Sequence, residues 1–127
     1  MKTEQIYRIF RDESTGISID SRSVSKGQIF FALWGQSFNG NKYAAEALEK
    51  GASYAVIDDP AFETEKTILV DDCLLELQTL AGYHRREMNV SVLAITGTNG
   101  KTTTKELIAA IMAKKYRIHY TKGNLNN

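Results

Sequence analysis

The sequence predicts an α/β fold in which a small N-terminal domain, residues 1–89, is followed by the first β–loop–α–β unit of a parallel-sheet domain, residues 90–127. In the first part, short runs rich in β-branched residues alternate with stretches of helical periodicity. In the second part, the continuous apolar run Val92-Leu93-Ala94-Ile95 is typical of a strand buried on both faces, and a glycine loop follows it directly.

The N-terminal domain is expected to alternate helices and strands. Helices are predicted at residues 3–10, 43–50 and from Asp71 or Asp72 to about 88, because apolar residues recur there at spacings of three and four. Strands are predicted at residues 17–20, 28–33, 53–57 and 67–70. The first two strands are expected either to form a hairpin or to lie side by side. The domain boundary is placed at Glu87-Met88-Asn89.

The second unit is predicted from a helix and two strands around the glycine loop. Thr104, Leu107, Ile108, Ile111 and Met112 recur at helical spacing, and residues 117–121 resume as a strand after the strand at 92–95. One such unit cannot cover both faces of a parallel sheet, so the second domain is expected to be incomplete and the chain to be the N-terminal part of a longer protein.

Composition excludes several classes of protein. The chain has 127 residues, with 16 Lys and Arg against 15 Asp and Glu, and this net charge of +1 predicts no nucleic-acid partner. No apolar run is long enough for a signal peptide or a membrane span, so a cytoplasmic protein without a membrane partner is expected. The protein is also expected to be a monomer. The single cysteine, Cys73, cannot form an intrachain disulfide and is expected to be inert.

The segment Thr96-Gly97-Thr98-Asn99-Gly100-Lys101-Thr102-Thr103 is predicted to be a phosphate-binding loop for ATP. Glycines let the backbone approach a phosphate closely, and the N–H groups and dipole of the following helix favour an anion. The predicted nucleotide contacts are Gly97, Thr98, Asn99, Gly100, Lys101, Thr102 and Thr103. Lys101 would stabilise charge that grows on the phosphates, and Thr102 would act with it and contribute a ligand to Mg²⁺.

This loop departs from the usual phosphate-loop pattern. The pattern places a glycine six positions before the lysine, where this sequence has Ile95. The loop is therefore a shortened variant, and a plain Gly-Lys turn between a strand and a helix is the alternative interpretation.

The stretch from Ile95 to Thr103 resembles the ATP loop of the Mur ligases, the amino-acid ligases of peptidoglycan synthesis; folate polyglutamate ligases have a similar loop. The upstream segments Asp20-Ser21-Arg22, Gly27 to Leu33, Phe38-Asn39-Gly40 and Ala47 to Ala52 resemble the N-terminal, UDP-binding domain of the Mur ligases and favour that family. Residues 120–127, with Gly-Asn-Leu-Asn-Asn, are most similar to the members that add D-alanyl-D-alanine. The departures are Asn41, where His is common, and Ala94, where Gly is common.

The resemblance implies an ATP-driven ligase that joins D-alanyl-D-alanine to a UDP-N-acetylmuramoyl tripeptide through an acyl phosphate. It implies substrate contacts at Ser21, Arg22, Asn39, Gly40, Asn124, Asn126 and Asn127. From local chemistry alone, Asp20-Ser21-Arg22 is a polar turn and the asparagine-rich end a polar terminus.

Two alternative functions stay open. The chain could be a non-catalytic UDP-sugar or nucleotide-binding module, or part of another Mur ligase; as a fragment it is expected to lack turnover.

His84 and His119 have no partner at metal-ligand spacing and are expected to be structural. Trp34 is expected either to pack under its loop or to stack on a base.

Overall fold

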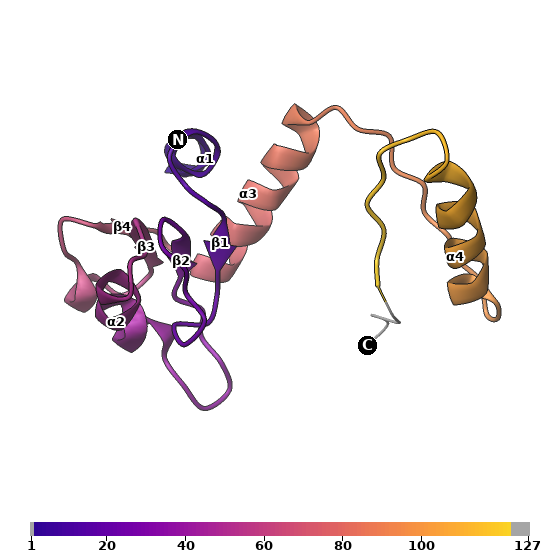
Figure 1. Cartoon of the computed structure of the whole chain (residues 1–127). Helices are drawn as coiled ribbons and strands as arrows, with labels where there is room; N and C mark the ends of the chain where they lie inside the picture. The colour runs from indigo at the N-terminus through magenta and orange to yellow at the C-terminus, as the bar shows by residue number, and fades with distance from the viewer. Residues whose placement is uncertain (1, 123–127) are drawn as a thin grey trace. The chain divides into compact units, whose positions relative to one another are not determined.

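The computed structural model describes residues 2–122 and divides into two compact units, residues 1–90 and residues 91–127 (Figure 1).

The first unit is built on a four-stranded parallel sheet. Its strands are β1 (Ile17–Ser18), β2 (Ile29–Phe31), β3 (Tyr54–Ile57) and β4 (Thr67–Leu69), in the order β1-β2-β3-β4. Phe30 pairs with Ser18 on one side and Ala55 on the other. The predicted α/β class is confirmed, and the first two strands lie side by side in parallel, so the hairpin alternative is wrong.

Helices cover both faces of this sheet. They are α1 (Lys2–Asp12), α2 (Ala44–Glu49) and α3 (Cys73–Glu87); α2 contacts β2 and β3, while α3 contacts β2 and α1. All three residues of β2 are buried although successive side chains point to opposite faces. The core therefore extends on both sides of the central strands, as in other parallel sheets.

Two short 3₁₀ turns follow strands β2 and β3. They are η1 (Gly40–Tyr43) and η2 (Pro60–Phe62), capped by the side chains of Asn39 and Asp59. The helix predicted at residues 43–50 is thus a 3₁₀ turn that continues into α2, because the Asn39 side chain starts the turn earlier.

The second unit contains α4 (Lys101–Met112), which is longer than the periodicity predicted. The strands predicted at 92–95 and 117–121 are not formed. A strand needs a neighbour to pair with, and within the described residues neither segment has one; Val92 and Leu93 remain about two-thirds exposed. The later segment is instead held beside α4, where Lys105 Nζ donates to Thr121 O at 2.5 Å.

Among residues 2–122, no helix has the length and apolar character needed to span a bilayer.

Candidate functional site

Three polar segments leave the sheet at the carboxyl ends of neighbouring strands. Residues 20–22 follow β1, a hairpin at residues 34–39 follows β2, and Asp58 follows β3. Because the strands are parallel, these ends share one edge, which is where open α/β sheets bind ligands. The hairpin projects below the sheet in Figure 1. The predicted substrate residues Ser21, Arg22 and Asn39 belong to these segments, and Gly40 follows the hairpin directly.

The turn at residues 20–22 is fixed by charge. Arg22 Nη2 and Nε donate to the two carboxylate oxygens of Asp20 at 2.7 and 2.9 Å. The pKa of Asp20 is lowered to about 2, first by the side-chain hydrogen bond from Arg22 and then by the Arg22 backbone N–H. Ser21 is buried, and its carbonyl accepts a hydrogen bond from Lys50 Nζ at 3.1 Å. Arg22 is the exposed cation of this turn.

The hairpin at residues 34–39 is closed by an antiparallel bridge between Trp34 and Asn39. Asn39 Oδ1 accepts from both the backbone N and the side-chain Nδ2 of Asn41 at 2.9 Å, so this predicted substrate residue also holds its own loop. Gly40 lies against the segment that follows β2, and a Cβ there would be 2.2 Å from Leu33 O. Only glycine fits this close approach.

Asp58 joins these segments, although no sequence pattern predicted it as a site residue. Its Oδ1 accepts from Trp34 Nε1 at 2.9 Å and from Asn41 Nδ2 at 2.8 Å, and its Oδ2 accepts from Cys73 N at 3.0 Å. Burial alone would raise the pKa of Asp58, but the hydrogen bonds from Cys73, Asn41 and Trp34 outweigh it and lower that pKa. Its place directly after a parallel strand was the signal that could have identified it.

The predicted phosphate loop lies in the second unit, where Gly100 has φ 75° and caps α4. Gly97 also has a positive φ, of 153°, and the Lys101 ammonium donates to its carbonyl. Thr102 and Thr103 are exposed in the first turn of α4, where backbone N–H groups have no partner inside the helix. This loop conformation presents donors and a lysine at a helix N-terminus, as anion binding requires.

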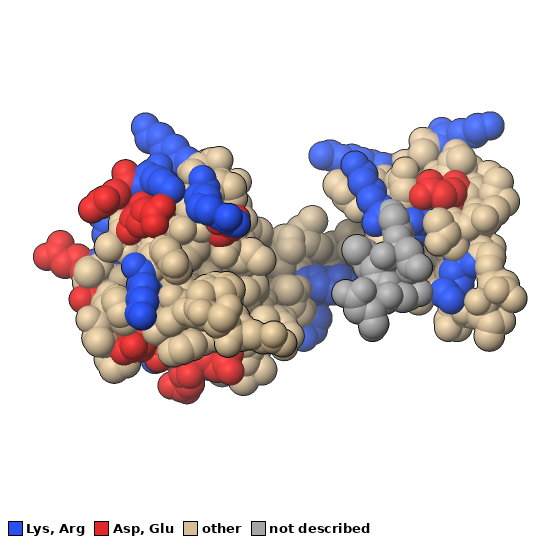
Figure 2. Space-filling model, turned by 90° about the horizontal axis from the view of Figure 1, so that it is seen from below, with Lys and Arg blue, Asp and Glu red and all other residues tan. Residues whose placement is uncertain are grey.

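The charge of the chain is unevenly divided. Residues 91–127 contain six Lys and Arg against one Glu, whereas residues 1–90 contain 10 Lys and Arg against 14 Asp and Glu. In Figure 2 the unit that carries α4, on the right, shows several blue groups and one red group. Although the whole chain has a net charge of only +1, the unit that contains the predicted phosphate loop is basic. This local positive charge favours a polyanionic ligand.

The described residues offer little to a metal ion by themselves. Within residues 2–122 there is no group of three or more His, Cys, Asp or Glu side chains placed to hold one. The Thr102 hydroxyl fits as a single protein ligand to Mg²⁺ beside nucleotide phosphates, since Mg²⁺ is commonly bound through phosphates, water and few protein groups. Asn124, Asn126 and Asn127, the remaining predicted substrate residues, lie outside the described residues.

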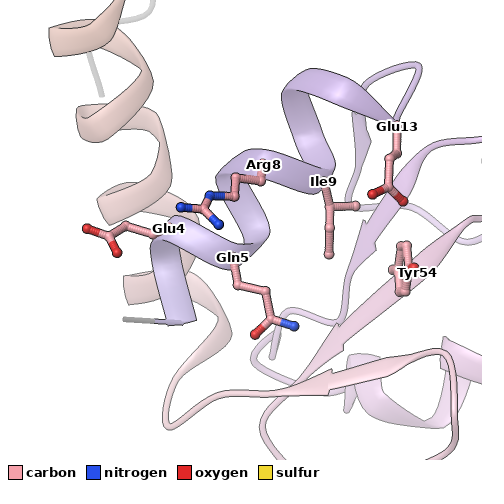
Figure 3. A pocket seen from close by; sticks show the side chains of 6 residues that line it. All are labelled: Glu4, Gln5, Arg8, Ile9, Glu13 and Tyr54. Carbon is pink, nitrogen blue, oxygen red and sulfur yellow. The ribbon is translucent and has the colours of Figure 1, made fainter.

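An open depression of about 470 Å³ lies elsewhere on the first unit, between α1 and the start of β3 (Figure 3). Its lining is Glu4, Gln5, Arg8, Ile9, Glu13 and Tyr54. Tyr54 is the first residue of β3, so this depression is at the amino end of the strand and separate from the polar segments at the carboxyl edge.

A parallel sheet and a predicted phosphate loop are both typical of nucleotide-dependent α/β proteins, and comparison with known proteins shows the family. A family model described as "Mur ligase family, catalytic domain" matches residues 13–116, and the chain belongs to this family.

Two relatives are similar to this chain over most of its length. UDP-N-acetylmuramoyl-tripeptide--D-alanyl-D-alanine ligase of Bacillus subtilis (strain 168) is 40% identical over 116 residues, which is 88% of this chain and 25% of the relative. UDP-N-acetylmuramoyl-L-alanyl-D-glutamate--2,6-diaminopimelate ligase of Aquifex aeolicus (strain VF5) is 38% identical over 99 residues, 76% of this chain and 20% of the relative. The chain thus spans about a quarter of the length of the curated relatives it matches.

A solved structure agrees with these relatives. The MurF ligase of Thermotoga maritima, determined in complex with ADP, superposes on this chain with a TM-score of 0.78 at 29% sequence identity. The match covers 93% of this chain and 27% of the solved chain.

Proposed function

We propose that the chain is the N-terminal part of an ATP-dependent ligase that joins D-alanyl-D-alanine to a UDP-N-acetylmuramoyl tripeptide in peptidoglycan synthesis. In this proposal residues 1–89 bind the UDP end of the substrate, and residues 90–127 begin the ATP-binding domain. The 40% identity with the Bacillus subtilis ligase, over 88% of this chain, is the observation that carries the proposal.

Each unit would contribute one part of the reaction. Arg22, Ser21 and the hairpin at residues 34–39 would hold the uridine diphosphate at the carboxyl edge of the sheet. In the second unit, the loop from Gly97 to Thr103 would hold the triphosphate, and Lys101 would leave the Gly97 carbonyl to contact phosphate oxygens. Thr102 would add a ligand to Mg²⁺, which neutralises phosphate charge when bound.

The proposed reaction has two steps, and every atom of the substrates is found again in the products. The tripeptide carboxylate attacks the γ phosphorus of ATP and ADP leaves, giving an acyl phosphate. The amine of D-alanyl-D-alanine then attacks the acyl carbon, phosphate leaves, and the nitrogen gives up its proton as the amide forms. Lys101 supports the first step electrostatically, because negative charge is redistributed over the phosphate oxygens as the bond to ADP breaks.

Other assignments have less support. A diaminopimelate-adding ligase is the main alternative, because a relative with that activity is 39% identical over 90% of this chain. A solved diaminopimelate-adding ligase, however, superposes with a TM-score of only 0.50, against 0.78 for the MurF ligase. The segment at residues 120–127 also favours the D-alanyl-D-alanine-adding reaction. We further propose that the protein acts in the cytoplasm as a monomer.

Calorimetric titration of the 127-residue chain tests the proposal. UDP-N-acetylmuramoyl tripeptide is expected to bind saturably, and Arg22→Ala, which removes the exposed cation, is expected to weaken it about tenfold or more. Lys42→Ala, which removes an exposed cation in η1, is the matched control. In a separate titration with Mg²⁺ and ATP, Lys101→Ala is expected to abolish whatever binding the wild-type chain shows. Failure of the UDP-linked tripeptide to bind would contradict the assignment of the first unit.

A further inference from the structure

Trp34, the one tryptophan of the sequence, is held in place at the carboxyl edge although its ring is exposed. The residue is 60% exposed, yet its Nε1 donates to Asp58 Oδ1 at 2.9 Å. An exposed indole N–H can donate to water, so this bond is not needed to satisfy a buried group. A charge-assisted bond to a carboxylate instead fixes the direction of the ring.

A second exposed ring lies at the same hairpin. Phe38 is 54% exposed and its ring covers the Cα of Gly35, where a Cβ would be only 2.0 Å from Phe38 Cε1. Gly35 N also donates to Phe38 O at 3.0 Å. The hairpin therefore presents two large aromatic side chains beside the segments predicted to bind the substrate.

Asp58 ties this hairpin to the rigid part of the unit. The same Oδ1 that accepts from Trp34 accepts from Asn41 Nδ2, and Oδ2 accepts from the first N–H of α3, at Cys73. Asn41 and Cys73 are fully buried. One carboxylate thus links the direction of an exposed ring to the core.

We propose that Asp58 is a positioning residue, which holds the Trp34 ring as a stacking surface for the planar base of the uridine nucleotide. Aromatic side chains stack on nucleobases through their π faces, and a ring that is already oriented loses less conformational entropy on binding. The inference rests on the proposed function, since it concerns how the same site recognises the UDP end.

UDP titrated into the 127-residue chain tests this role. Binding is measured by calorimetry and by Trp34 fluorescence, which reports on the hairpin alone because no other tryptophan is present. UDP is expected to change the emission saturably, whereas pyrophosphate, which has no base, is expected to leave it unchanged. Asp58→Asn is expected to weaken UDP binding about five- to tenfold. Asp59→Asn is the matched control, because Asp59 accepts from Ala61 N at 3.0 Å within η2.

A double-mutant cycle separates positioning from general damage to the fold. Trp34→Phe keeps an aromatic ring but removes the N–H that Asp58 accepts. In that background, Asp58→Asn is expected to have a much smaller effect on UDP affinity, measured by calorimetry. An equal loss of affinity in both backgrounds would overturn the positioning role.

The remaining outcomes distinguish this inference from the proposed function. If UDP binds, but Trp34 emission does not respond and Asp58→Asn binds like the wild type, the inference fails and the proposed function stands. If neither UDP nor the UDP-linked tripeptide binds the wild-type chain, the proposed function fails and the inference fails with it.

Discussion

Asn41 and Asp58 exchange two hydrogen bonds. Asn41 Nδ2 donates to Asp58 Oδ1 at 2.8 Å, and Asp58 N donates to Asn41 Oδ1 at 3.0 Å. Asn41 is 0% exposed, so its amide has exchanged water for these partners and for Asn39 Oδ1. A buried amide with satisfied donors and acceptor fixes the loop at one register, because any shift would leave a polar group unpaired.

Asn41→Ala is therefore expected to destabilise the first unit by about 2–4 kcal/mol, since it leaves the Asp58 N–H unpaired and opens a cavity. The measurement is urea-induced unfolding followed by far-ultraviolet circular dichroism. Lys42→Ala, an exposed neighbour, is the control and is expected to change the free energy of unfolding by less than about 0.5 kcal/mol. Equal unfolding midpoints for the two variants would contradict the role given to Asn41.

Acid is expected to weaken the fold partly through Asp58. Its hydrogen bonds lower its pKa below the ordinary value of 3.8, so the unfolded chain takes up the proton first as the pH falls. The stabilisation is complete above the unfolded pKa and is lost as the pH falls through the folded pKa. Asp58→Asn cannot titrate, so its free energy of unfolding is expected to fall less steeply below about pH 4 than that of the wild type.

Measurements at two salt concentrations separate the contribution of Asp58 from that of the exposed pair Asp20–Arg22, because the pKa of Asp20 is lowered as well. The pKa of Asp20 is lowered to about 2, but this pair is exposed and its attraction is screened at high ionic strength. Acid-denaturation series in low and high salt are the measurement. An Asp58→Asn variant with the same acid dependence as the wild type in high salt would show that Asp58 contributes nothing.

Sequence patterns predicted the secondary structure of the first unit better than that of the second, for a physical reason. Strands β2 and β3 and helix α3 are local patterns whose partners lie within the chain, so periodicity predicted them closely; of the two aspartates predicted to start the helix, Asp72 is the cap. Residues 92–95 have an equally clear strand pattern, but pairing is a property of two segments and the described residues supply no second one. Apolar periodicity predicts what a segment can form and not whether a neighbour is present.

The candidate site shows a similar division. Gly97, Gly100 and Lys101 were predicted as a site because a phosphate loop requires residue types at fixed spacing, and both glycines have the positive φ that such a loop would need. Asp58 was not predicted, because its partners Trp34 and Asn41 are 24 and 17 positions away in the sequence. A contact between distant segments leaves no local spacing to recognise.

Cys73 is expected to resist thiol reagents while the protein is folded. It is 0% exposed, its Sγ lies 3.3 Å from Val56 O, and burial, followed by the nearby charge of Asp58, raises its pKa to about 12. The reactive thiolate is therefore scarce and inaccessible in the native state at neutral pH. Labelling with a chromogenic disulfide reagent is expected to be at least about 100-fold slower in buffer than in denaturing urea. Rapid labelling in buffer would mean that the start of α3 opens readily.

Gly40 and Gly100 are expected to differ sharply when each is replaced by alanine. A Cβ at Gly40 would lie 2.2 Å from Leu33 O and 2.6 Å from Ala32 C, so two backbone segments must separate. Gly40→Ala is expected to cost about 2 kcal/mol or more and to weaken UDP binding, because the hairpin that carries Trp34 must move. At Gly100 a Cβ would meet nothing within 4 Å, and the cost is the positive φ of 75°, about 1 kcal/mol, at the start of α4.

Trp34 fluorescence during urea unfolding separates these two effects, because the tryptophan reports on the first unit. Gly40→Ala is expected to shift the midpoint to lower urea, and Gly100→Ala to leave it at the wild-type value, since Gly100 belongs to the second unit. Ser37→Ala is the matched control, because it changes only an exposed position of the same hairpin. Leu33→Ala would not serve, because Leu33 packs against the hydrophobic core. A wild-type midpoint for Gly40→Ala would mean that the hairpin tolerates displacement, and that Gly40 does not fix its position.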